Sequence, residues 1–265
     1  TATQPAFSHL HPHVKPLAPS GWAPRPLIDF ANELFTATAG RTRVVWRIDR
    51  DRPTSWESLA DELEQPVNRQ VLCIVNLKRH ATALLDRLKE RGVEGLLHLS
   101  TQMCPRHRAE VLSQIQQRLR NGEPIRLIAT QCIEAGVDLS FPQVYRALGP
   151  LEAIAQAAGR CNRHGEMLTP GEVIVFLPES DGKTLYPPGS YEHAAKTAET
   201  FLLSLRGEMQ GNLDDCQIIA SPERIARYYE WLYDLKMSSK KDTLTKYEVR
   251  QALESLNFSD LAQHY

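Results

Sequence analysis

Two arginines and a glutamine that could bind an anion lie within one short segment of the chain. Gln156, Arg160 and Arg163 are spaced i, i+4 and i+7, so they would share one face of a helix that runs through the segment. Planar guanidinium groups match the oxygens of a polyphosphate. The alternative is a surface face held by salt bridges, for which the acids nearest in the sequence are Glu152 and Glu166. We interpret the cluster as a polyphosphate site.

Small polar residues follow three apolar segments that have the pattern of buried strands, at residues 71–75, 96–99 and 125–129. The residues in question are Asn76, then Ser100 and Thr101, then Thr130 and Gln131. In open parallel sheets, ligands bind outside the carboxyl ends of the strands. Hydroxyl and amide groups at that edge suit phosphate oxygens, although any one of these residues alone could equally cap a turn or the start of a helix.

The elements that would position these residues alternate between strand and helix. Apolar segments predict six strands, at residues 43–48, 71–75, 96–99, 125–129, 144–148 and 171–177. Apolar residues at helical spacing predict helices between them, at residues 79–91, 105–120 and 151–162. This order is typical of the α/β class, a parallel sheet with flanking helices. After Pro178, helices at 191–206, 221–236 and 245–256 would form a small helical appendage.

A further short, polar helix is predicted before the second strand. Thr54 and Glu57 have the spacing of a capping box, which would begin this helix. Asp61 and Glu62 fall inside it rather than at the end of an apolar strand, so we do not interpret them as a magnesium-binding pair of acids.

The segment Gly182-Lys183-Thr184 has the ending of a phosphate-binding P-loop and follows a predicted strand. The P-loop pattern also requires a glycine five residues before Gly182, where this chain has Leu177. Two prolines after Tyr186 prevent the helix whose N-terminus would hold the phosphate. The sequence therefore predicts anion-binding arginines without a phosphate cradle in the same chain.

Composition and charge exclude several classes of protein. The chain has 265 residues, of which 42% are hydrophobic and 24% charged, which argues against disordered, collagen-like and membrane classes. Its 31 basic and 32 acidic residues give a net charge of −1, which excludes a strongly basic polyanion binder but allows a local basic stripe. No apolar run approaches the ~18 residues of a membrane-spanning helix, and the pattern of a signal peptide is absent. We expect no membrane association.

The cysteines favour a reducing compartment. They form no Cys-x-x-Cys pair and are odd in number, at positions Cys73, Cys104, Cys132, Cys161 and Cys216. We therefore expect free thiols and a cytoplasmic location. Two groups could be considered as metal ligands, Cys104 with His107 and the alternating His9, His11 and His13. Solvated loop histidines explain both groups better, and we predict no metal site.

Four segments resemble the motifs of superfamily 2 helicases. Residues 156–163 (QAAGRCNR) resemble motif VI, and residues 129–138 (ATQCIEAGVD) resemble motif V. Residues 71–76 (VLCIVN) are similar to motif IV, and residues 99–108 (LSTQMCPRHR) to the stretch called IVa. Residues 1–5 also resemble motif III, which ends the first RecA-like domain. The combination resembles the CRISPR-associated helicase-nuclease of type I interference systems.

The resemblance implies a domain organisation. Residues 1–40 would be an interdomain linker that starts in motif III, residues 41–178 the second RecA-like domain, and residues 179–265 a helical C-terminal extension. In such helicases two RecA-like domains clamp ATP between them, and the first carries the P-loop and the acidic magnesium motif. ATP and Mg²⁺ would therefore be bound mainly by a first domain outside this chain. We expect the chain to be inactive alone.

The resemblance also implies residue roles. Arg163 would be the arginine finger on the γ-phosphate, with Arg160 also on the phosphates. Gln156 would help to place the attacking water, and Asp138 would approach the ribose, with Gly136 in the same nucleotide-binding motif. The backbone of single-stranded DNA would be bound from the strand-end edge and from motif III by Asn76, Thr101, Thr130, Gln131, Thr1 and Thr3.

The implied partners are single-stranded DNA, the first RecA-like and nuclease domains, and the CRISPR surveillance complex, in a prokaryotic cytoplasm. Two alternatives remain. One is another superfamily 2 helicase that acts on DNA or RNA. The other is a non-catalytic RecA-like module that binds nucleic acid or protein. The paired arginines favour the motor, because a binding platform has no use for an arginine finger.

Overall fold

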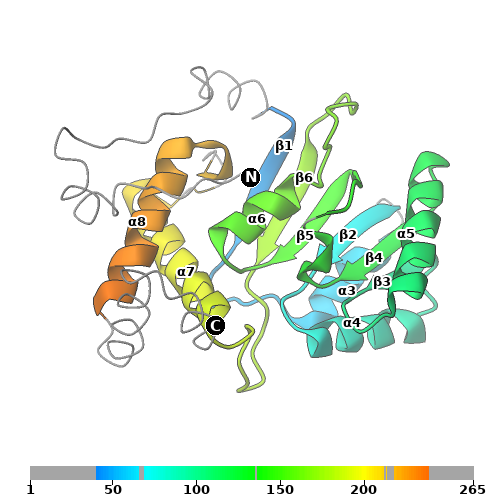
Figure 1. Cartoon of the computed structure of the whole chain (residues 1–265), viewed down its shortest axis with the longest axis horizontal. Coiled ribbons are helices and arrows are strands. Elements are labelled where there is room, and N and C mark those ends of the chain that lie inside the picture. Colours follow the sequence, from blue (N-terminus) through cyan, green and yellow to red (C-terminus); the bar gives the residue numbers. More distant parts are fainter. Residues whose placement is uncertain (1–39, 66–68, 135, 212, 214–217, 239–265) are drawn as a thin grey trace, which may run out of the picture.

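The computed structural model describes residues 40–65, 69–134, 136–211, 213 and 218–238. Its centre is a six-stranded sheet in the order β1-β6-β5-β2-β4-β3, in which every pair of neighbours is parallel (Figure 1). The strands are β1 (Thr42–Arg47), β2 (Gln70–Ile74), β3 (Leu96–Leu99), β4 (Ile125–Ala129), β5 (Gln143–Ala147) and β6 (Gly171–Phe176). The predicted parallel α/β sheet is confirmed.

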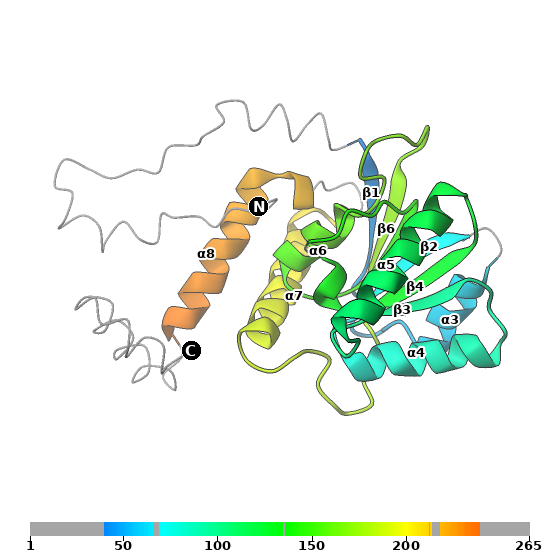
Figure 2. The ribbon, with the colours of Figure 1, turned by 45° about the vertical axis from the view of Figure 1, so that its right-hand side comes forward.

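Helices cover both faces of the sheet. They are α3 (Trp56–Glu64), α4 (Lys78–Glu90), α5 (Pro105–Arg120), α6 (Leu151–Ala158), α7 (Ser190–Glu208) and α8 (Pro222–Ser238). Side chains alternate along each strand, so β2 places Cys73 against α3 and α4 and places Leu72 in the core under α5 and α6. Figure 2 shows α5, α6 and α7 along one side of the sheet.

The helices after β6 share the core of the sheet. Phe201 on α7 and Tyr228 on α8 are buried in the same apolar cluster as strand residues such as Val144. Their rings lie 5.9 Å apart between centroids, and Trp231 packs edge-on against Phe201. Figure 1 shows α8 on the outer side of α7, away from the sheet. The predicted helix at 245–256 lies outside the described residues.

The start of α3 differs from the sequence-based expectation. The N-cap is Ser55, whose Oγ accepts a hydrogen bond from the backbone N–H of Ser58 at 3.0 Å. Thr54 instead donates its backbone N–H to Leu177 at 2.8 Å and so ties this segment to the end of β6. Glu57 forms an ion pair with Arg91 after α4. The predicted capping box of Thr54 and Glu57 is therefore wrong, because both groups have long-range partners that local spacing does not reveal.

Among the described residues, no helix is long and apolar enough to cross a membrane.

Candidate functional site

The helix that carries Gln156 ends earlier than its sequence pattern suggests. We expected a helix to residue 162, but α6 ends at Ala158 with Gly159 as its C-cap. Asn162 then adopts a φ of +41°, which turns the chain out of the helix. The prediction that Gln156, Arg160 and Arg163 share one helical face is therefore wrong. Gln156 is half-buried on α6, and the two arginines lie in the loop that follows.

Arg160 is buried and already hydrogen-bonded within the protein. Its Nε donates to the carbonyl of Ile133 at 3.1 Å, and its Nη2 donates to the carbonyl of Glu134 at 2.7 Å. Burial lowers the pKa of Arg160, and the nearby charge of Arg163 lowers it further. Arg160 therefore fastens the loop after β4 to the loop after α6.

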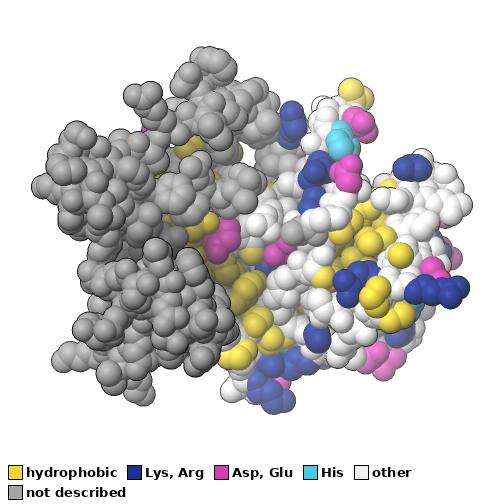
Figure 3. Space-filling view, in the orientation of Figure 1, with side chains coloured by type: hydrophobic (Ala, Val, Ile, Leu, Met, Phe, Trp, Pro, Cys, Tyr) yellow, Lys and Arg dark blue, Asp and Glu magenta, His cyan; other side chains and the backbone are white. Residues whose placement is uncertain are grey.

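Arg163 lies on the surface beside an acid that sequence proximity did not indicate. Its Nε is 2.8 Å from Oδ1 of Asp138, and its backbone N–H donates to Ser140 Oγ at 3.0 Å. Glu152 and Glu166 are the acids nearest to the cluster in the sequence, but the partner of Arg163 is Asp138, from the loop before β5. Figure 3 shows acidic, basic and histidine side chains gathered over the loop between α6 and β6.

Gly136 lies in the same loop as Asp138. It has a φ of +74°, a backbone conformation that glycine adopts at little cost. This turn separates Glu134, whose carbonyl binds Arg160, from Asp138, whose side chain binds Arg163. The structure thus brings four of the five predicted nucleotide residues into two adjacent loops.

Four of the five predicted strand-end residues line one hollow of about 460 Å³, whereas Ser100 is fully buried and bonds to His98. The lining of the hollow includes Asn76, Thr101, Thr130 and Gln131, which come from the ends of three parallel strands. Thr101 is exposed, whereas Thr130 is only 3% exposed. Thr1 and Thr3, also predicted to contact DNA, lie outside the described residues. The carboxyl edge of the sheet therefore holds the expected group of hydroxyl and amide side chains.

Two basic residues in this hollow were missed from the sequence. Lys78 and Arg79, both exposed, line it from the start of α4. They follow Asn76 after a single leucine, so the signal was present in the sequence as a basic pair directly after a strand end. Two positive charges therefore lie at this hollow, and the guanidinium of Arg79 also donates to the carbonyl of Thr184.

Asn76 lies beneath the hollow rather than in its mouth. It is 2% exposed, and its amide nitrogen donates to the carbonyl of Leu148 at 2.7 Å. Its Oδ1 accepts hydrogen bonds from Arg146 at 2.8 Å and from Tyr191 at 2.9 Å. Gln131 in turn donates to the backbone carbonyl of Asn76 at 2.7 Å. The amide of Asn76 is thus engaged within the protein.

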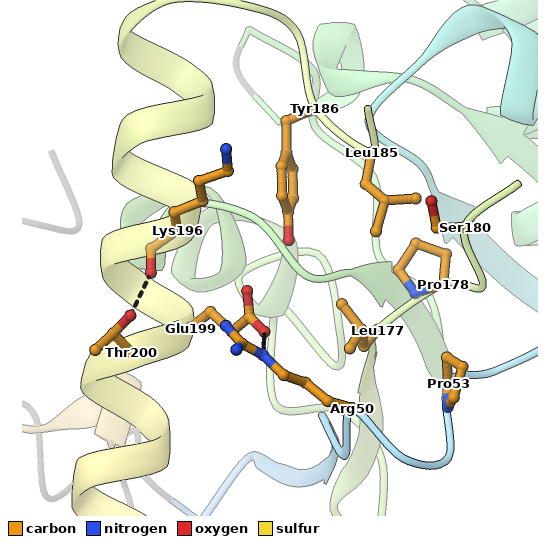
Figure 4. A pocket seen from close by; sticks show the side chains of 10 residues that line it. All are labelled: Arg50, Pro53, Leu177, Pro178, Ser180, Leu185, Tyr186, Lys196, Glu199 and Thr200. Atoms are coloured by element: carbon orange, nitrogen blue, oxygen red, sulfur yellow. Dashed lines mark hydrogen bonds and ion pairs between the residues drawn. The ribbon is translucent and has the colours of Figure 1, made fainter. Parts of the chain in front are cut away.

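The segment that resembles the end of a P-loop borders a different hollow, of about 510 Å³, between the β6–α7 connection and α7 (Figure 4). Its lining includes an ion pair at 2.5 Å between Arg50 Nε and Glu199 Oε1. Lys183 pairs with the neighbouring Asp181, and α7 does not begin until Ser190. A phosphate cradle needs a helix directly after Thr184, and the structure has none there.

The described residues contain no group of three or more histidine, cysteine or acidic side chains that could hold a metal ion. Cys73, Cys104, Cys132 and Cys161 are free thiols. The histidines at positions 9, 11 and 13, and Cys216, lie outside the described part of the chain.

Comparison with known proteins agrees with this geometry. Residues 67–166, which include Arg160, Arg163, Asp138 and the strand-end residues of the hollow, match the family model described as the C-terminal part of the CRISPR-associated nuclease/helicase Cas3. These residues form a Cas3-like helicase C-terminal domain. The chain is 32% identical over 193 residues to the CRISPR-associated nuclease/helicase Cas3 of Haloferax volcanii, covering 63% of this chain and 20% of that protein.

Other similarities support the same family and fold. The putative Cas3 of Methanocaldococcus jannaschii is 23% identical over 138 residues, which are 50% of this chain and 18% of that protein. The crystal structure of T. fusca Cas3-ATP superposes with a TM-score of 0.54 at 18% identity, covering 94% of this chain and 28% of that chain. A chain in the structure of a CRISPR RNA-guided surveillance complex, pre-nicking, superposes with a TM-score of 0.52 at 20% identity. The match covers 84% of this chain and 28% of that chain. The sheet is therefore RecA-like, and the chain spans about a fifth of the length of its curated Cas3 relatives.

Proposed function

We propose that residues 41–178 are the second motor domain of an ATP-dependent helicase that moves along single-stranded DNA in CRISPR interference. The observation that carries this proposal is the pairing of Arg163 with Asp138 on the surface of the Cas3-like domain. An exposed arginine balanced by one exposed carboxylate can exchange that partner for a phosphate at small cost. A first RecA-like domain would supply the P-loop, and the parent protein would be an ATP hydrolase.

Arg160 and Arg163 lie in the loop after α6, residues 159–170, which we call the arginine loop and which would face the phosphates of ATP. When bound, ATP supplies the phosphoryl group whose developing charge a guanidinium stabilises. Arg163 would exchange Asp138 for that group across the interface, while Arg160 keeps its bonds to the loop after β4. Gln156 would orient the attacking water, and Gly136 and Asp138 would lie near the ribose. Mg²⁺ would be held by acids of the first domain, since the described residues offer no metal cluster.

The strand-end hollow would hold the DNA backbone. Thr101 and Gln131 offer hydrogen-bond donors, and Lys78 and Arg79 offer charge, none of which requires a particular base. Thr130 and Asn76 would shape this edge from within, because both are nearly fully buried. Thr1 and Thr3 would add contacts from motif III. We also propose that the parent works with the CRISPR surveillance complex and a nuclease domain in a prokaryotic cytoplasm, where its free cysteines would stay reduced.

Binding of a dT oligonucleotide by this chain tests the DNA contact directly. We expect weak binding that falls as salt rises, because phosphate contacts release counterions. Lys78→Ala should weaken binding and lower the salt slope by about 1. Lys196→Ala is the matched control, since this exposed lysine borders the other hollow and pairs with Glu192. Equal affinity for both variants and the parent chain would place the DNA elsewhere.

Turnover distinguishes a motor from a binding platform. This chain alone should not hydrolyse ATP with or without DNA. Turnover above a mock preparation that is abolished by Arg163→Ala would contradict that expectation.

A further inference from the structure

The most deeply buried charge in the described structure belongs to a strand residue outside the helicase-like motifs. Arg146 on β5 is 0% exposed. Its Nη2 is 2.8 Å from Glu134 Oε1 and donates to Tyr191 Oη at 2.8 Å. Its Nη1 donates to Asn76 Oδ1 at 2.8 Å and to the carbonyl of Ala147 at 2.6 Å. One guanidinium therefore holds side chains from three separate segments.

These three segments lead to different sites. Asn76 follows β2, and its backbone carbonyl accepts a hydrogen bond from the side-chain amide of Gln131, which lines the strand-end hollow. Glu134 follows β4, and its backbone carbonyl binds Arg160 of the arginine loop. Tyr191 lies in the first turn of α7, beyond the residues that match the Cas3 family model. Arg146 is thus linked through Asn76 to the hollow, through Glu134 to the arginine loop, and through Tyr191 to the C-terminal helices.

The alternative is that this cluster only stabilises the fold. A buried ion pair is weak support for stability, because desolvation offsets most of its attraction and apolar residues of the same volume often do better. Burial raises the pKa of Glu134 even beside Arg146, which shows how costly this site is for its charge. Stability alone therefore does not account for this cluster.

Gly149, which has no side chain, leaves the space that this network occupies. A Cβ atom placed on Gly149 would lie 2.8 Å from Tyr191 Oη, 3.2 Å from Arg146 Nη2 and 3.4 Å from Asn76 Oδ1. Glycine at this position allows the three polar groups to meet directly after β5.

We propose that Arg146 and Tyr191 are positioning residues that fix the loop after β4. Through this loop, DNA binding at the strand-end hollow, the position of Arg160 and the position of the first turn of α7 would be coupled. The coupling to DNA rests on the function proposed above, whereas the positioning of Glu134 and Arg160 does not. Because the hydroxyl of Tyr191 completes the network, its removal should loosen the loop without removing the buried ion pair.

Two readouts on this chain test the proposal. The first is hydrogen exchange at the backbone amide of Glu134, which bonds to Gln131, and at the Nε of Arg160, which bonds to Ile133. The second is affinity for a dT oligonucleotide. The variants are Tyr191→Phe and Gly149→Ala, since removing Arg146 would leave Glu134 as an uncompensated buried charge and endanger folding. Tyr145→Phe is the control, because this tyrosine, next to Arg146 in the chain, loses its hydrogen bond to Glu62 on the opposite face of the sheet. Tyr191→Phe loses two, one accepted from Arg146 and one donated to Asn76.

Tyr191→Phe should speed exchange at both positions about fivefold and weaken oligonucleotide binding by a similar factor. Gly149→Ala should act in the same direction. Combining it with Tyr191→Phe should cost less than the sum of the two, because the nearest clashing atom is gone. Tyr145→Phe should leave both readouts within twofold. If Tyr191→Phe matches Tyr145→Phe in exchange, the network is only structural and the proposal fails. If the parent chain binds no oligonucleotide, the DNA contact fails, while exchange still decides whether Tyr191 positions Arg160.

Discussion

The Nη2 atom of Arg160 lies 2.7 Å from the backbone carbonyl oxygen of Glu134. The Nε of the same guanidinium bonds to Ile133, so one side chain satisfies two carbonyls of the loop after β4. Arg163 makes its ion pair on the surface instead, with a side chain that is 39% exposed. The two arginines of one motif therefore differ in what their removal should cost the fold.

Arg160→Ala should lower the stability of this chain more than Arg163→Ala does. Removing Arg160 leaves two carbonyls without their donor, and each buried group left unsatisfied costs about 1–3 kcal/mol. Arg163→Ala breaks an exposed ion pair and should change the free energy of unfolding by less than about 1 kcal/mol. Urea unfolding of both variants measures the difference. Equal losses would mean that Arg160 does not fasten the loop.

The sequence predicted the six strands and most helices because buried strands are continuous apolar runs and the amphipathic helices keep their apolar spacing. It also placed Thr101, Thr130 and Gln131 at one edge, because parallel strands end on the same side of a sheet. It did not reveal the partners of the charged groups. Asp138 pairs with Arg163, and Arg146 with Glu134, through contacts that only the folded sheet creates. The early end of α6 was missed for a similar reason, because the backbone groups of Arg160 and Asn162 pair with Phe141 of a distant segment instead of continuing the helix.

His80 should make the chain less stable as the pH falls. Burial lowers the pKa of His80 from 6.5 to about 4, and its ring packs on Trp56 at 4.8 Å between centroids. Above pH 6.5 the ring is neutral in both states. Below it the unfolded chain binds a proton and the folded chain does not, so the free energy of unfolding falls by at most about 3 kcal/mol down to pH 4.

Urea unfolding between pH 7 and pH 4.5 measures this slope. His80→Leu should flatten it in part, since burial also lowers the pKa of His98 and carboxylates contribute as well. His107→Leu, at an exposed position on α5, is the control and should keep the parental slope. A slope unchanged by His80→Leu would show that this ring is not the group responsible.

The thiols should differ in reactivity. Burial raises the pKa of Cys73 and of Cys161 to about 12, and the thiolate is the reactive form. Cys104 is exposed, and the half-buried Cys132 donates its thiol to the carbonyl of Leu99 at 3.5 Å. With a thiol reagent at pH 8, we expect Cys104 to react quickly, Cys132 more slowly, and Cys73 and Cys161 only after unfolding.

Counting thiols before and after denaturation checks this order. All five should be titratable in denaturant without reductant, and Cys104→Ser should remove one fast-reacting thiol. A count below five that reductant restores would reveal a disulfide and argue against a reducing compartment.

Arg163 should decide turnover in the parent helicase. A guanidinium aimed at a transferring phosphoryl group stabilises charge that develops only in the transition state, so its loss should lower kcat far more than nucleotide affinity. Arg163→Ala should reduce kcat by roughly 10³ to 10⁵-fold. Arg163→Lys should restore little of it, because an ammonium group cannot reproduce the planar fork. Asp138→Asn removes the resting partner of Arg163 and the carboxylate proposed near the ribose, so it should weaken nucleotide binding. It should not lower kcat to that degree, because the guanidinium stays in place.

The control for this measurement is Arg106→Ala, which breaks a comparable exposed ion pair with Glu110 on α5. Steady-state ATPase kinetics with saturating single-stranded DNA, on variants whose melting temperatures match the parent, separate the two roles of Arg163. A surface arginine that merely pairs with Asp138 would cost less than about 1 kcal/mol and would be replaced readily by lysine. Near-parental turnover in both Arg163 variants would therefore show that this loop does not act on the phosphates, and the proposal of a second motor domain would fail with it.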